Sequence, residues 1–133
     1  MATEQQALIP PLKLKWVAFG QVPAKSNHYS IRAPKKGMPF TIKTPELKDW
    51  EKNFAAQVTA NAKNQQISNQ VRITLRVWFR SQASDLDNAA KGILDGLQKA
   101  SVIVNDNRVK ELHMFKDVDP SRPRVEITVE ELY

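Results

Sequence analysis

The sequence predicts a single α+β domain in which a mixed β-sheet has two main helices packed on one face. Apolar residues at every second position over 71–79, alternating with Arg72, Thr74, Arg76, Trp78 and Arg80, predict a half-buried strand. Apolar residues recur every three or four positions over 44–63 and again over 87–100, which predicts two amphipathic helices. A chain of 133 residues is the usual size of one such domain.

The first third of the chain is predicted to contain a leader, one strand and a long loop. Residues 1–11 end in two prolines and are expected to form a flexible leader, so the domain itself spans 12–133. Alternating apolar residues predict a strand over 12–19. Prolines and basic residues then predict a loop over 20–39, and its length indicates either phosphate binding, which we favour, or a disordered connector.

The remaining elements follow from periodicity and turn composition. Thr44 and Pro45 provide an N-cap and a first-turn proline for the first helix, and Asp87 is a suitable N-cap for the second. In order, we expect a short strand at 40–43, a helix from Thr44-Pro45 to about Lys63, a strand at 71–80, a helix from Asp87 to Ala100, a turn at 105–107, a strand at 108–116, a turn at 119–123 and a strand at 125–130.

The charge of the chain is unevenly distributed. The net charge is +6, but residues 1–83 contain 13 basic and 4 acidic side chains, whereas residues 84–133 contain 7 basic and 10 acidic ones. A basic portion followed by an acidic cluster suits an enzyme that holds a polyanion and a metal ion. The simpler alternative is that the positive charge serves only solubility.

Several functional classes are excluded or disfavoured. The chain has no cysteine, which excludes disulfides, thiolate nucleophiles, zinc ribbons and iron–sulfur clusters. The N-terminus lacks the basic start of a signal peptide, and no apolar run approaches the ~18–20 residues that span a bilayer. We therefore expect a cytoplasmic protein with no membrane partner and no organic cofactor.

Chemistry is concentrated in one segment, where four aspartates and a lysine lie within 22 residues. Asp85 and Asp87 are two positions apart, so in an extended segment their carboxylates would leave the same face and could share one hard cation. Lys91 and Asp95 follow at steps of four, which places them in one polar stripe of the predicted helix. Asp106 comes 19 positions after Asp87, with enough chain between them to return to the same strand end.

This set suits a magnesium site that acts on phosphates. Asp85, Asp87 and Asp106 would supply the carboxylates, since Mg²⁺ retains waters and accepts phosphate oxygens as further ligands. Lys91 would offset developing charge or orient the attacking water, and Asp95 would be a ligand, a partner of Lys91 or a water contact. Each residue also has an ordinary explanation as a helix cap, an exposed ion pair or a turn. Together, however, three neighbouring aspartates without a cation would be a costly arrangement.

Basic residues that could contact DNA fall into two groups. Arg72, Arg76 and Arg80 lie on the polar face of the predicted 71–80 strand, although solvent-facing strands often contain arginine without any binding role. The 20–39 loop adds Lys25, Asn27, Lys35 and Lys36. Other kinds of site fit poorly. A calcium-binding EF-hand loop would need a glycine that is absent here, a histidine zinc site would need paired histidines, and no glycine-rich phosphate-binding loop is present.

The acidic segment resembles the RusA family of Holliday junction resolvases. The residues that carry this resemblance are Asp85-Leu86-Asp87-Asn88, Lys91, Asp95 and Leu97, then Asn105-Asp106, with weaker similarity at Pro23 to Tyr29, in the Trp50 helix and in the terminal strands. The resemblance covers most of residues 12–132. One departure is Asn105, where the family often has an acid.

The resemblance implies a homodimeric α/β endonuclease, of a kind common in phages and prophages, that uses Mg²⁺ or Mn²⁺ to cut four-way DNA junctions symmetrically. It implies that Asp85, Asp87 and Asp106 are catalytic metal-binding carboxylates and that Lys91 is the catalytic lysine. We expect Asn88 and Asp95 to contact these groups rather than the metal. The alternatives are a non-catalytic junction- or DNA-binding protein that retains the fold, and a metal-dependent phosphatase acting on small phosphates.

Overall fold

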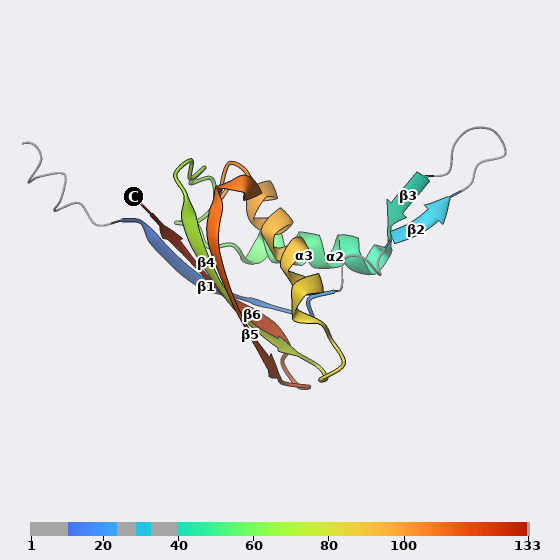
Figure 1. Ribbon diagram of the computed structural model, residues 1–133. Helices are drawn as coiled ribbons and strands as arrows, with labels where there is room; N and C mark the ends of the chain where they lie inside the picture. The colour runs from blue at the N-terminus through green and yellow to red at the C-terminus, as the bar shows by residue number, and fades with distance from the viewer. Residues whose placement is uncertain (1–10, 24–28, 33–39, 133) are drawn as a thin grey trace, which may run out of the picture.

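The sheet has four strands, and only one of its strand pairs is parallel. A computed structural model describes residues 11–23, 29–32 and 40–132. The strand order is β1-β6-β4-β5, with β1 antiparallel to β6, β6 antiparallel to β4, and β4 parallel to β5. The strands are β1 (Lys13–Phe19), β4 (Val71–Phe79), β5 (Val109–Val118) and β6 (Arg124–Glu131). The mixed sheet predicted from the sequence is confirmed (Figure 1).

Two helices, α2 (Pro45–Gln57) and α3 (Leu86–Lys99), cover one face of the sheet (Figure 1). Every second residue of the central strand β4 is buried, as the alternation predicts. These side chains meet the buried stripes of the two helices in one core that includes Ile73, Leu75, Val77, Phe79, Trp50, Phe54, Ile93 and Leu97. None of the helices in the described ranges is long and apolar enough to cross a bilayer.

The parallel pairing of β4 and β5 determines where the two ends of α3 lie. A parallel neighbour must start at the same end of the sheet as the first strand, so the connecting helix has to run back along the sheet. α3 therefore begins near the C-terminal end of β4 and ends near the N-terminal end of β5. A short 3₁₀ helix, η2 (Asp106–Arg108), leads directly into β5.

The predicted 20–39 loop is wrong in part, because it contains a strand. β2 (Tyr29–Arg32) pairs antiparallel with β3 (Phe40–Lys43), which confirms the predicted 40–43 strand. The pair forms a separate two-stranded sheet. A four-residue strand without a regular apolar alternation gains its structure from its partner, so its own sequence gives little signal.

The first helix starts as predicted and ends earlier. Thr44 is the N-cap, and its side-chain oxygen accepts a hydrogen bond from the Leu47 N–H. The helix ends at Gln57 rather than near Lys63. Beyond it the chain turns, with positive φ at Asn64 and Gln66, to pair with the segment after α3 through an Ile67–Ile103 bridge. This long-range pairing overrides the local helical pattern.

Candidate metal and DNA site

The first turn of α3 brings Asp85, Asp87 and Asn88 together. The helix begins at Leu86 with Asp85 as its N-cap, so the predicted N-cap at Asp87 is wrong by two positions. The Asn88 side-chain amide donates to Asp85 Oδ2 (3.4 Å), and the Asn88 backbone N–H donates to Asp87 Oδ1 (3.0 Å). The Asn88 side chain therefore contacts Asp85, whereas its contact with Asp87 is made through the backbone.

This arrangement differs from the extended pair that the spacing suggested. Asp85 has extended backbone angles, but Asp87 already lies inside the helix. Both carboxylates are consequently at the positive end of the α3 dipole, which stabilises negative charge. Among the ion pairs found between described residues, none involves Asp85 or Asp87.

Two side chains from other elements fix the loop that leads into Asp85. Lys116 of β5 donates from Nζ to the carbonyl oxygens of Gln82 (2.8 Å) and Ser84 (2.5 Å). Gln21 donates from Nε2 to Ser84 Oγ (3.4 Å) and accepts from the Arg80 N–H (2.9 Å). Sequence reasoning missed both roles, because each depends on a partner at least 32 positions away.

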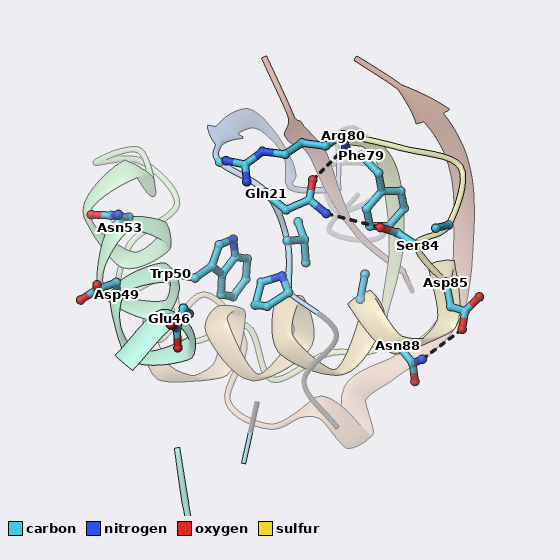
Figure 2. A pocket seen from close by; sticks show the side chains of 15 residues that line it. Gln21, Glu46, Asp49, Trp50, Asn53, Phe79, Arg80, Ser84, Asp85 and Asn88 are labelled. Carbon is cyan, nitrogen blue, oxygen red and sulfur yellow. Dashed lines mark hydrogen bonds between the residues drawn. The ribbon is translucent and has the colours of Figure 1, made fainter. Parts of the chain in front are cut away.

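A hollow of about 580 Å³ adjoins the Asp85 end of α3. Figure 2 shows it between α2 and the start of α3, with the Trp50 indole turned into it. Its floor is apolar, whereas its rim includes Gln21, Arg80, Ser84, Asp85 and Asn88, together with Glu46, Asp49 and Asn53 of α2. An apolar floor with a polar rim beside paired carboxylates is typical of a substrate site. The acids of α2 were not predicted, since their local pattern indicates only an exposed helix face.

Lys91 and Asp95 follow the carboxylate pair along α3. Lys91 is exposed one turn after Asp87, and Asp95 is half-buried one turn further. Lys91 takes part in none of the ion pairs found between described residues. A cationic side chain at this position can approach a phosphate bound near Asp87.

Asp106 lies at the other end of α3. Its backbone N–H donates to Gln98 Oε1 (3.1 Å) in the last turn of the helix. Gln98 lies eleven positions after Asp87 in α3, which is about 16 Å along the axis. The expectation that Asp106 returns to the strand end near Asp85 is therefore not met within one chain. The reason is the parallel pairing of β4 and β5, which keeps the start of β5 at the opposite end of the sheet.

Asp85 and Asp87 provide part of the oxygen ligand set that a magnesium ion requires. The described residues contain no group of three or more His, Cys, Asp or Glu side chains that could hold a metal ion. Asp85 and Asp87 still fit Mg²⁺, since this ion is usually bound through one or two carboxylates and completes its shell with waters and substrate phosphates. One chain therefore offers two suitable carboxylates at this site. The third predicted carboxylate, Asp106, is not among them.

The predicted arginine stripe does not form one surface. Arg72 binds Glu111 through two hydrogen bonds (3.2 and 3.1 Å), which hold the pKa of Glu111 below its usual range. Arg76 pairs with Asp117 (3.0 Å), and like Arg72 it lies on the sheet face opposite the helices. Arg80 instead lines the hollow near Asp85. The remaining candidates, Lys25, Asn27, Lys35 and Lys36, lie outside the described residues.

Comparisons with known proteins agree with the resemblance found in the sequence. The family model described as endodeoxyribonuclease RusA matches residues 19–130. A crossover junction endodeoxyribonuclease RusA of Aquifex aeolicus (strain VF5) is 31% identical over 106 residues. The matched region covers 79% of this chain and 81% of that protein.

Proposed function

The chain belongs to the RusA family of endodeoxyribonucleases, and from this premise we propose that it resolves four-way DNA junctions by Mg²⁺-dependent hydrolysis of two symmetric strands. The observation that supports the proposal most directly is the Asp85–Asn88–Asp87 cluster beside the hollow at the start of α3. Mn²⁺ would serve the same oxygen ligands. Such an enzyme is expected in the cytoplasm, where cellular DNA is accessible.

Each side chain has a defined task in this proposal. Asp85 and Asp87 would hold the metal, which polarises the scissile phosphate and lowers the pKa of a water. Asn88 orients both carboxylates, and Lys116 and Gln21 fix the loop before them. Lys91 would neutralise charge that develops on the phosphate oxygens.

The separation of Asp106 from Asp87 supports a homodimer. A two-fold axis that pairs two copies of α3 antiparallel would place the last turn of one helix beside the first turn of the other. Asp106 of one copy would then join Asp85 and Asp87 of its partner. Within a single chain, Asp106 lies too far from this pair to do so. Two such sites related by symmetry would cut the two matching strands of a four-way junction.

The proposal is tested by cleavage of a synthetic four-way junction with Mg²⁺. Wild type should nick opposing strands at symmetric positions, and Asp87→Asn should lose this activity because one carboxylate ligand is gone. Asp87→Asn should still bind the junction, since removing a carboxylate near DNA removes repulsion. Equal cleavage by both proteins would overturn the assignment, and clearly weaker junction binding by Asp87→Asn at fixed salt would contradict the predicted effect on binding.

Two other functions predict different results in additional assays. A junction-binding protein without catalysis would show salt-dependent binding but no divalent-metal binding by calorimetry. A small-molecule phosphatase would hydrolyse a generic phosphoester and leave DNA intact. The family match and the retained Asp85, Asp87, Lys91 and Asp106 favour the nuclease.

A further inference from the structure

A second strongly charged surface lies away from the Asp85–Asp87 pair, in a cleft between α2 and α3. The cleft has a volume of about 390 Å³. Four of its seven lining residues are lysines and one is acidic. We call this surface the lysine cleft; its lining residues are Lys43, Lys48, Glu51, Lys52, Ala55, Gly96 and Lys99.

Close packing of the two helices creates the cleft. At Gly96 of α3, a Cβ atom would lie 2.7 Å from the Phe54 ring, so only glycine permits this approach. The approach brings Lys99 of α3 next to Glu51 of α2, where Nζ and Oε2 are 2.5 Å apart. Lys43, at the end of β3, reaches the same carboxylate at 3.0 Å.

One carboxylate thus fixes two ammonium groups. The Glu51 side chain is only 15% exposed, and its two lysine partners are held at its oxygens. The neighbouring Lys99 ammonium lowers the pKa of Lys43, although Glu51 opposes this effect. Because Glu51 holds both ammonium groups, these two lysines lose less side-chain entropy when they bind an anion.

Two further lysines extend the positive surface along α2. Lys48 and Lys52 are exposed and four positions apart, so their side chains are neighbours on the helix. Within the described ranges, neither takes part in an ion pair. Lys48 and Lys52 therefore add positive charge beside a hollow large enough for a sugar-phosphate unit.

We propose that the lysine cleft binds backbone phosphates of the DNA substrate. Lysine ammonium groups contact phosphates as point charges without reading the sequence. Lys99 directly follows Gln98, which contacts Asp106, so the cleft is at the Asp106 end of α3. This inference rests on the proposed nuclease function and adds a second DNA contact, one helix length from Asp85.

The test compares two double variants that each remove two positive charges. Lys48→Gln/Lys52→Gln changes the cleft, whereas Lys13→Gln/Lys63→Gln removes two exposed lysines that do not line it. Binding of a four-way junction is measured by fluorescence anisotropy as a function of salt, without divalent metal. Circular dichroism confirms that each variant is folded.

The cleft variant should bind more weakly. For each cleft that contacts the junction, the slope of log K against log salt should fall by about 1.8, since each phosphate contact contributes about 0.9. Between about 50 and 200 mM salt, its loss of affinity should be roughly tenfold smaller than that of wild type for each such cleft. The control should keep the wild-type slope. Equal slopes for the two variants would overturn the proposal. Metal-dependent cleavage by wild type is scored separately: its absence would refute the nuclease function, while the binding comparison would still test the cleft.

Discussion

Asp85 and Asp106 lie at opposite ends of α3. Asp85 occupies the N-cap position before the first turn, and Asp106 contacts Gln98 in the last turn. The helix between them is 14 residues long, or about 20 Å. A single magnesium ion cannot contact both residues in one chain, so their joint action requires a second copy.

Mixing two inactive variants tests this arrangement. Asp85→Asn and Asp106→Asn should each be inactive alone, but a mixed dimer contains one site with both native carboxylates. Random exchange makes about half of the dimers mixed, and one of the two sites in each mixed dimer has both native carboxylates. About a quarter of all sites should therefore be active, and they should produce single-strand nicks. If each site used residues of one chain only, both sites of every mixed dimer would be damaged. Persistent inactivity after verified subunit exchange would therefore contradict the shared site.

Lys116 is expected to act by positioning the loop that precedes Asp85. Lys116→Met removes the donors to the carbonyls of Gln82 and Ser84, so the carboxylate pair loses a support. We expect the cleavage rate to fall by about tenfold, as for other residues that orient metal ligands. The Mg²⁺ concentration that gives half of the maximal rate should rise. Titration of the cleavage rate with Mg²⁺ measures both effects.

The matched control for Lys116 is Lys110→Met, an exposed lysine on the same strand. It loses the same charge and should leave the Mg²⁺ dependence unchanged. Lys116→Arg, which keeps a donor, should recover part of the activity. An equal effect of both methionine variants would show that net charge, and not loop position, is responsible.

Alanine substitutions at two glycines of α3 should change the free energy of unfolding in opposite directions. At Gly96 the new Cβ would lie 2.7 Å from the buried Phe54 ring, and such overpacking costs about 1–3 kcal/mol. At Gly92 the nearest atom, in the Trp50 ring, is 3.7 Å away, so the higher helix propensity of alanine should stabilise by up to about 1 kcal/mol. Urea denaturation gives both free energies of unfolding. A stabilised Gly96→Ala variant would refute the close packing of α2 and α3.

Glu51 should contribute pH-dependent stability. Burial raises its pKa, but hydrogen bonds from Lys99 and Lys43 outweigh burial and hold the pKa below its ordinary value of 4.5. A carboxyl with a lowered folded-state pKa stabilises the protein above the unfolded-state pKa, and this contribution is lost as pH falls through the folded-state value. The Tm difference between wild type and Glu51→Gln should be constant above about pH 5.5 and should shrink below about pH 4.5.

Glu46→Gln serves as the comparison for Glu51, because Glu46 is exposed on the same helix and has no ion pair within the described residues. Its effect on Tm should be the smaller of the two at pH 7. A Glu51→Gln difference that grows toward acid pH would contradict the predicted sign.

Local patterns in the sequence determined most of the elements. The alternation in β4 and the Thr44 N-cap of α2 depend on neighbouring residues, so both were predicted correctly. The aspartate–lysine motif also carries the resemblance to the RusA family, which the family match over residues 19–130 confirms. The β2 strand was missed because it gains its structure from pairing with β3, and the end of α2 was missed because it depends on a distant segment.

Only the tertiary structure decided how the site residues are distributed. The sequence placed Asp106 in a turn after the second helix, but not at which end of the sheet that turn lies. The parallel pairing of β4 and β5 fixes it at the end opposite Asp85. Lys116 and Glu51 likewise acquire their roles from partners brought together by the sheet and by the close contact of two helices. Strand direction and helix packing arise from contacts between distant residues, which local periodicity does not encode.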